Sequence, residues 1–348
     1  MSDTKDLASG EICLDGSTAE RIFKLCPAAA PTPLVGLPPI ANRCAVRSVF
    51  AKDERNRIGL GSFKALGAAY AIAKQADDRV KKGLADSHEN ALRNVTFVCA
   101  SAGNHGLSMA AGARLFGAAA VVFIAETVPE AFAMRLRDKG AEVIRAGDTY
   151  EASMAAAMDA ASANGWQLLP DSSWVGCTAP ARDVMEGYLL MGAEIDTQID
   201  TEPTHVFLQA GVGGLAAAAA ASARQSWGAA PKILVVEPDR APALWESVKA
   251  GRPVTADGPV SNMGRLDCKE PSHLALKYLA REANAFLTIS DDEAIAAVDV
   301  LREHGIDTTP SGAAGLAALL VSAPYRDALA LTPESRVLIY LSEGPEDG

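Results

Sequence analysis

The stretch HVFLQAGVGGLAA, residues 205–217, decides the fold, because an apolar run, a glycine-rich turn and an alanine-rich run follow one another in it. The run His205 to Ala210 shows no period-two alternation, which is typical of a strand buried on both faces of a parallel sheet. The glycines at 211, 213 and 214 predict a tight turn, and Leu215 to Ser226 predicts a helix packed on the sheet. The stretch therefore indicates one strand–turn–helix unit of an α/β protein.

The same alternation of strands and helices continues along the chain. Further strands are expected at Thr96 to Ala100, Ala119 to Ile124, Glu142 to Arg145, Trp166 to Leu169, Lys232 to Glu237 and Arg336 to Leu341. Helices are expected at Gly106 to Phe116, Pro129 to Lys139, Tyr150 to Asn164, Ala179 to Ile195, Asp291 to His304 and Ser311 to Ser322. The first 50 residues are rich in proline, and we expect an irregular arm with one short helix near Thr18 to Leu25. The predicted fold class is α/β with largely parallel sheets covered on both faces.

Composition and charge narrow the classes of protein that fit. The chain has 348 residues, 49% of them hydrophobic and 22% charged, as expected for a soluble globular protein. A net charge of −11 argues against a nucleic-acid partner, and no apolar run is long enough for a membrane span. Six cysteines without CxxC spacing read as reduced thiols, and no secretory signal precedes the body, so a cytoplasmic protein is expected. The histidines show no metal-ligand spacing, so no metal site is predicted.

Lys64 lies in the segment GSFKALG, residues 61–67, whose other members are small or apolar. A lysine forced into an apolar pocket loses proton affinity and becomes a nucleophile that can form a Schiff base. The alternative is a solvated lysine on the surface of a helix, which is where most lysines lie. The spacing alone leaves these two interpretations about equally open.

The glycine turn at 211–214 lies between a strand and a helix, where backbone N–H groups and the helix dipole favour an anion. It could also be a tight turn without a ligand. A third interpretation is a dinucleotide fingerprint, because Gly211-x-Gly213-x-x-Ala216 is followed by Glu237 at the end of the next strand, where a ribose-binding acid would lie.

Two more segments place polar groups near strand ends. The segment SAGNHG, residues 101–106, follows a strand and either caps the next helix or presents the amide of Asn104 to a phenolate oxygen. His105 is by itself more typical of a packed core histidine than of a catalyst. Ser342 follows the closing strand, which is the ligand side of such a sheet.

Together, the segments SFK (62–64), SAGNHG (101–106), GVGG (211–214) and SEG (342–344) resemble the fold type II pyridoxal phosphate enzymes. Within that group the chain is most similar to the diaminopropionate ammonia-lyases. That similarity rests on FKALG (63–67), DSSW (171–174), MEGY (185–188), QAGVG (209–213), Cys268 ahead of Glu270-Pro271, and SGA (311–313). The segments keep a consistent order from about residue 55 to the end.

The resemblance implies two three-layer domains with the cofactor between them. Residues 1–85, with an N-terminal arm at 1–50, and residues 186–348 would form the larger, cofactor-binding domain. Residues 86–185 would form a smaller, mobile substrate domain. The resemblance also implies a homodimer.

The resemblance further assigns roles to single residues of this chain. Lys64 would form the imine with pyridoxal phosphate and later move the α-proton. The cofactor would also be bound by Phe63, by Asn104 at its 3′-oxygen, by Gly211, Val212, Gly213 and Gly214 at its phosphate, and by Ser342 at its ring nitrogen. Asp171 would be a second catalytic residue that binds or protonates the leaving group. Ser101, Ala102, Gly103 and His105 would surround an amino-acid substrate.

Ala102 departs from the lyase pattern, which has an aspartate there, while serine dehydratases and racemases have a serine. Because alanine cannot transfer a proton, this chain is not expected to racemise or to process both enantiomers. The predicted reaction is α,β-elimination of ammonia from an amino acid, which yields a 2-oxo acid. The alternatives are a dehydratase or β-replacement enzyme on the same cofactor, an NAD-dependent oxidoreductase using the glycine turn, and a non-catalytic binding protein.

Overall fold

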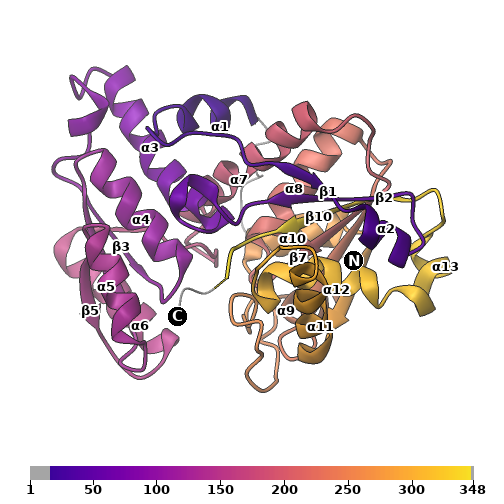
Figure 1. The fold of residues 1–348 in the computed structure, drawn as a ribbon. Coiled ribbons are helices and arrows are strands. Elements are labelled where there is room, and N and C mark those ends of the chain that lie inside the picture. The colour runs from indigo at the N-terminus through magenta and orange to yellow at the C-terminus, as the bar shows by residue number, and fades with distance from the viewer. Residues whose placement is uncertain (1–15, 346–348) are drawn as a thin grey trace.

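The computed structural model describes residues 16–345, and Cys13 and the first residues of the expected arm lie outside that range. The chain builds two sheets (Figure 1). The six-stranded sheet has the order β1-β2-β10-β7-β8-β9 and the four-stranded sheet the order β5-β4-β3-β6. Every strand pair is parallel except β1 with β2. The expected α/β fold with largely parallel sheets is confirmed.

The strands of the larger sheet are β1 (Leu34–Gly36), β2 (Ser48–Asp53), β7 (His205–Gln209), β8 (Lys232–Pro238), β9 (Ala285–Ile289) and β10 (Arg336–Leu341). Those of the smaller sheet are β3 (Thr96–Ala100), β4 (Ala119–Ile124), β5 (Glu142–Arg145) and β6 (Gln167–Leu168). All four strands of the smaller sheet were expected, and three of them have the expected bounds.

The helices of the first half are α1 (Gly16–Phe23), α2 (Pro38–Arg43), α3 (Gly67–Lys81), α4 (Asn104–Leu115), α5 (Glu130–Asp138) and α6 (Tyr150–Asn164). Those of the second half are α7 (Ala179–Gln198), α8 (Gly214–Trp227), α9 (Ala243–Ala250), α10 (His273–Glu282), α11 (Asp291–Arg302), α12 (Pro310–Leu320) and α13 (Arg326–Leu329). Short 3₁₀ turns occur at Arg57–Gly59, Phe63–Leu66, His88–Asn90 and Ala323–Tyr325.

The proline-rich arm is more regular than expected. Its residues form β1, α2 and the first part of β2, and β1 pairs antiparallel with β2 at the edge of the larger sheet. Pro38 and Pro39 occupy the first positions of α2, where a missing N–H breaks no helical bond. Proline content therefore misled the prediction, because prolines at helix starts and between elements are compatible with ordered structure.

The strands of the larger sheet are buried on both faces. In β7, Val206 and Leu208 point into one core and Phe207 into another. Helices α8 and α10 cover the first face, and α11 and α12 cover the second. This two-sided burial is the reason for the continuous apolar run in the sequence. Among the described residues, no helix has the length and apolar character that crossing a membrane requires.

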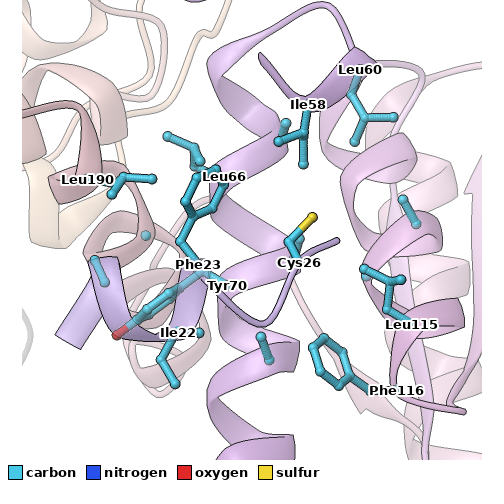
Figure 2. A pocket seen from close by; sticks show the side chains of 17 residues that line it. Ile22, Phe23, Cys26, Ile58, Leu60, Leu66, Tyr70, Leu115, Phe116 and Leu190 are labelled. Carbon is cyan, nitrogen blue, oxygen red and sulfur yellow. The ribbon is translucent and has the colours of Figure 1, made fainter. Parts of the chain in front are cut away.

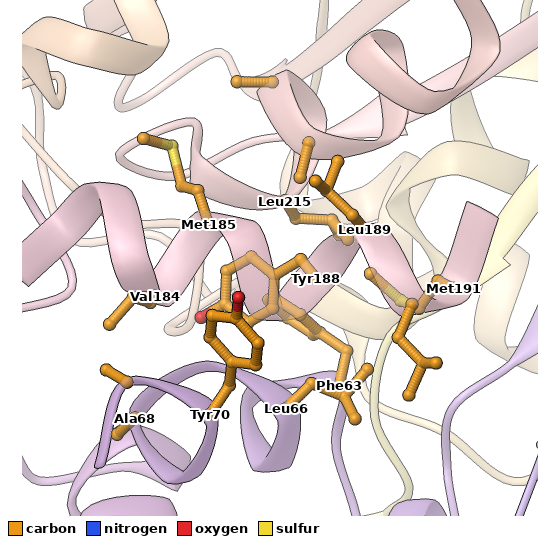
Figure 3. Packing of buried hydrophobic residues seen from close by; sticks show 14 of the residues in the cluster. Phe63, Leu66, Ala68, Tyr70, Val184, Met185, Tyr188, Leu189, Met191 and Leu215 are labelled. Atoms are coloured by element: carbon orange, nitrogen blue, oxygen red, sulfur yellow. The ribbon is translucent and has the colours of Figure 1, made fainter. Parts of the chain in front are cut away.

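The smaller sheet shares the first core. Alternate residues of β3 face that core beside α4, while Val98 and Ala100 face α6 and pack with Ala157 and Ala161. Helices α3 and α7 pack on one another, as Figure 3 shows. Their contact is close, because a Cβ on Gly187 of α7 would lie 2.7 Å from the Cβ of Tyr70 in α3.

Candidate cofactor and substrate site

Lys64 lies in the 3₁₀ turn Phe63–Leu66 that leads directly into α3. The hydroxyl of Ser62 caps this turn by accepting the Lys64 N–H at 3.2 Å. The N–H of Phe63 donates to the carbonyl oxygen of Ser342 at 3.0 Å. These bonds place Lys64 beside the carboxyl end of β10, which is the ligand side of a parallel sheet.

The turn that carries Lys64 rests on an aromatic contact (Figure 3). The rings of Phe63 and Tyr188 meet edge to face, with centroids 4.9 Å apart and planes at 62°. A Cβ on Gly67 would lie 2.7 Å from the Tyr188 hydroxyl oxygen, so only glycine fits there. That hydroxyl is buried, and no hydrogen-bond partner for it exists among the described residues. Burial raises the pKa of Tyr188 to about 12.

The ammonium of Lys64 forms an ion pair with the carboxylate of Asp171, which follows β6. Their side chains are only 23% and 22% exposed. Desolvation lowers the pKa of Lys64, but the charge of Asp171 outweighs it and the net pKa lies above the usual value. Desolvation likewise raises the pKa of Asp171, while the neighbouring Lys64 brings it well below its usual range. The expected loss of proton affinity at Lys64 is therefore wrong for the protein without its cofactor, because a partner carboxylate faces the amine.

The loop at 101–106 has the capping role that was one of its two expected alternatives. The buried hydroxyl of Ser101 accepts the N–H groups of Gly103 and Gly106 at 3.2 and 3.1 Å and so caps the start of α4. The amide of Asn104 donates to Oε2 of Glu343 at 3.1 Å. Ala102 is exposed at the tip of the loop.

His105 is 4% exposed, and its Nε2 donates to the carbonyl oxygen of Leu169 at 2.8 Å. Burial lowers the pKa of this imidazole, which favours its neutral form. Leu169 stands two residues before Asp171, so His105 supports the segment that carries this carboxylate. The packed histidine is the better of the two interpretations of His105.

The glycine turn has the geometry of an anion site. Helix α8 begins at Gly214 without a side-chain cap, and its N-cap, Gly213, has a φ of +100°. A Cβ on Gly211 would lie 2.9 Å from the sulfur of Cys268, so the backbone of the turn is closely enclosed. Uncapped N–H groups at a helix start attract phosphate.

The structure argues against a dinucleotide at the same turn. Glu237 is fully buried, and its two carboxylate oxygens accept the N–H groups of Leu244 and Trp245 at 2.7 and 2.8 Å. Both oxygens are therefore engaged in capping α9. Glu237 therefore has no free carboxylate oxygen for a ribose hydroxyl. The oxidoreductase interpretation loses the acidic residue that a dinucleotide site requires.

The Asp171 segment is fixed by a serine pair. The hydroxyls of Ser173 and Ser272 lie 2.7 Å apart, and the Ser173 hydroxyl also accepts the Leu274 N–H at 2.9 Å. Ser272 in turn donates its N–H to the carbonyl oxygen of Val212 at 2.9 Å. This chain of bonds connects the glycine turn with the segment that carries Asp171.

An apolar cavity lies on the other side of the Lys64 turn, between α1, α3 and α4 (Figure 2). No acidic or basic side chain of the described residues lines it. Its wall includes Phe23, Leu66, Tyr70 and Leu115. The charged ammonium and carboxylate of an amino acid would therefore find no ion-pair partner in this wall among the described residues.

Three contacts at the site thus involve five of the predicted residues. Lys64 contacts Asp171, Phe63 contacts Ser342, and Asn104 contacts the residue after Ser342. Sequence reasoning assigned no role to Glu343, Tyr188 or Ser173, although the motifs quoted for the resemblance contain all three.

These residues fit pyridoxal phosphate. The uncapped start of α8 suits its phosphate, Lys64 suits its aldehyde, and the Asn104 amide suits its phenolic oxygen. The unpartnered buried hydroxyl of Tyr188 lies against the same turn. The residues therefore provide a cradle, a nucleophile and polar contacts for one ligand.

Comparisons with known proteins agree with this geometry. The family described as "Pyridoxal-phosphate dependent enzyme" matches residues 25–343. The diaminopropionate ammonia-lyase of Escherichia coli strain K12 is 32% identical over 340 residues, which cover 91% of this chain and 85% of that protein. Two crystal structures of the Escherichia coli diaminopropionate ammonia-lyase are also similar, one in complex with D-serine and one with an aminoacrylate-PLP azomethine reaction intermediate. Each superposes on this chain with a TM-score of 0.87 at 29% sequence identity. Each superposition covers 99% of this chain and 94% of the other. The chain belongs to the fold type II pyridoxal-phosphate dependent enzymes, and pyridoxal 5′-phosphate is its cofactor.

Proposed function

We propose that this protein is an ammonia-lyase that acts on an amino acid with an amino group on its β-carbon. The products would be a 2-oxo acid and ammonia. When bound, pyridoxal phosphate supplies the conjugated system that delocalises charge from the substrate α-carbon. Lys64 would move the α-proton. The similarity to enzymes named diaminopropionate ammonia-lyase supports the same chemistry.

The ion pair between Lys64 and Asp171 is the observation that supports ammonia as the leaving group. Asp171 is a largely buried carboxylate whose partner is an ammonium. Once the nitrogen of Lys64 holds the cofactor, the carboxylate needs another cation in a poorly solvated place. The β-ammonium of a diamino acid meets this need, whereas the neutral hydroxyl of serine or threonine does not. Asp171 would thus accept a hydrogen bond from the β-ammonium of the substrate and keep that nitrogen protonated until it leaves.

The remaining predicted residues act as binding groups in this proposal. Residues 211–214 would bind the cofactor phosphate and Asn104 its 3′-oxygen. Phe63 would lie beside the cofactor, and Ser342 would face its ring nitrogen as a neutral partner. The loop at 101–103 would receive the substrate carboxylate.

We also propose the larger organisation that the family implies. Residues 86–185 would act as a smaller, mobile substrate domain against 1–85 and 186–348. The protein would be a cytoplasmic homodimer without a nucleic-acid or membrane partner. A size measurement in solution tests the dimer, and a single-chain mass would contradict it.

Substrate handedness follows from Ala102. No proton-transferring side chain stands at that position, so one enantiomer should react and the other should not. Assaying each enantiomer separately checks this. Comparable turnover of both would show that another group performs the proton transfer.

The ratio of products decides between the candidate reactions. Hydrolytic elimination from 2,3-diaminopropionate releases two ammonia molecules for each pyruvate, whereas dehydration of serine releases one. The experiment supplies each enantiomer of both amino acids to the purified, cofactor-loaded protein and measures ammonia and 2-oxo acid together. A two-to-one ratio on one diaminopropionate enantiomer is expected, with no product from Lys64→Ala. Turnover of serine alone at one-to-one would identify a dehydratase instead.

A further inference from the structure

One hydrogen bond joins the two sheets at the site. Asn104 opens α4 beside the smaller sheet, and its Nδ2 donates to Oε2 of Glu343 at 3.1 Å. Glu343 follows β10 of the larger sheet and pairs with Ser62, two residues before Lys64, in an isolated bridge. Glu343 is 4% exposed, so the bond lies inside the protein.

The carboxylate of Glu343 is held in place by α12. Thr309, the N-cap of α12, accepts the Gly312 N–H at 3.0 Å and donates its own hydrogen to Oε1 of Glu343 at 2.6 Å. Thr308 donates to the backbone carbonyl oxygen of Glu343 at 2.5 Å. The guanidinium Nε of Arg265 lies 3.8 Å from Oε2. Both ends of Glu343 are thus anchored, and its charge has a counterion.

This arrangement determines the orientation of the Asn104 amide. An ionised carboxylate only accepts hydrogen bonds, so the NH₂ end of the amide must face Glu343 and the carbonyl end must point away. One N–H is committed to Glu343, and the second N–H remains for another acceptor. An amide without such a neighbour can present either end.

We propose that Glu343 is a positioning residue for the cofactor. It fixes the amide of Asn104 so that the second N–H is offered to the 3′-oxygen of pyridoxal phosphate. The inference rests on the proposed role of Asn104. Glu343 acts through Asn104, and Arg265 is the counterion 3.8 Å from its Oε2.

The experiment is a double-mutant cycle on cofactor binding. The dissociation constant is measured by titrating cofactor-free protein with pyridoxal phosphate for Glu343→Ala, Asn104→Ala and the double variant. We expect each single change to weaken binding about tenfold, and the double change to weaken it no further than Asn104→Ala alone. Glu334→Gln, at an exposed carboxylate paired with Arg47, is the control and should bind like the unmodified protein.

Glu343→Gln gives a second, independent reading because it keeps the size of the buried side chain. It should weaken binding about two- to threefold, since its oxygen still accepts but the amide orientation is no longer fixed. It should also lower, by about one unit, the pH at which the visible band of the bound cofactor titrates, since a negative charge that favours the protonated form is lost. A purely structural role would leave that pH unchanged.

The outcomes separate the two proposals. If Asn104→Ala weakens binding while both Glu343 variants bind normally with an unshifted titration, the positioning role of Glu343 is wrong and the cofactor role of Asn104 stands. If the effects of the two single changes add, Glu343 acts independently of Asn104 and the inference is overturned. If Asn104→Ala itself has no effect, the assigned role of Asn104 fails first.

Discussion

The amine of Lys64 and the carboxylate of Asp171 show how a single contact changes the chemistry that a motif suggests. Small and apolar neighbours in the sequence predict a lysine with reduced proton affinity. A carboxylate 107 residues away in the chain reverses this direction, because its negative charge stabilises the ammonium. The pair therefore favours the ammonium form of Lys64 in the protein without its cofactor.

Asp171→Asn should destabilise the cofactor-free protein by about 1–3 kcal/mol at neutral pH, because it leaves a poorly solvated ammonium without its counterion. The pKa of Asp171 is lowered by folding, so its contribution is present above about pH 4 and is lost as pH falls further. The pKa of Lys64 is raised, so its contribution is present below about pH 10.4 and is lost above it.

Urea unfolding of the cofactor-free protein at several pH values measures this difference. The gap between Asp171→Asn and the unmodified protein should be widest between about pH 5 and pH 10. Asp299→Asn, at a pair with Arg302 in which both side chains are 60% exposed, is the control and should shift stability by less than about 0.5 kcal/mol. Equal losses of stability in the two variants would show that the Lys64–Asp171 pair contributes no more than an exposed ion pair.

At the start of α8, Gly213 combines backbone conformation with close packing. Its φ is +100°, and a Cβ there would lie 3.0 Å from Ala275 and 3.1 Å from Leu244. Gly213→Ala should therefore lower the free energy of unfolding by about 2–4 kcal/mol and weaken pyridoxal phosphate binding. Gly165→Ala is the matched control. Gly165 also has a positive φ, +67°, but no atom lies within 4 Å of the Cβ that alanine would add. This change should lower the free energy of unfolding by about 1 kcal/mol and leave cofactor binding unchanged. Thermal unfolding and a cofactor titration check both; similar losses would contradict the packing argument.

Helix α9 depends on the buried cap from Glu237. Desolvation raises the pKa of this carboxyl to about 8, although two backbone N–H groups oppose the shift. Glu237→Gln keeps one accepting oxygen and turns an NH₂ group toward the other backbone donor, so a loss of about 1–2 kcal/mol is expected. Because Leu244 of this helix packs on Gly213, cofactor affinity should fall as well. Unfolding in urea and a cofactor titration test this. An unchanged free energy of unfolding and an unchanged cofactor affinity would show that the Glu237 cap is dispensable.

Residues after strands of both sheets contribute to the candidate site, as the Asn104–Glu343 bond shows, so we expect the cofactor to stabilise the whole molecule. A ligand that binds only the folded protein adds about 2.7 kcal/mol at a hundredfold excess over its dissociation constant. We expect pyridoxal phosphate to raise the Tm with concentration and NAD to leave it unchanged, since Glu237 is engaged in capping α9. A Tm that rose with NAD instead would restore the oxidoreductase interpretation.

Local patterns were sufficient where an element is determined by its own residues. The strands β3, β4, β5 and β10 have the expected bounds. In β3, β4 and β10 the reason is a mainly apolar run between polar or glycine-rich segments, whereas β5 has only Val143 and Ile144 between two charged residues. The short edge strand β1 was missed, since its three residues become a strand only by pairing with β2. Strand β9 was missed too, and its register against β8 comes from tertiary packing.

The same division holds for the site. The sequence by itself determined which residues are candidates for the chemistry, because Lys64, Asn104 and the glycines of 211–214 stand in short motifs whose local geometry they largely dictate. Only the tertiary structure decided what each of them faces. It set Asp171 against Lys64 and Glu343 against Asn104, and it engaged Glu237 with α9. Charge interactions depend on distance and on burial, and neither quantity is written in the order of residues along the chain.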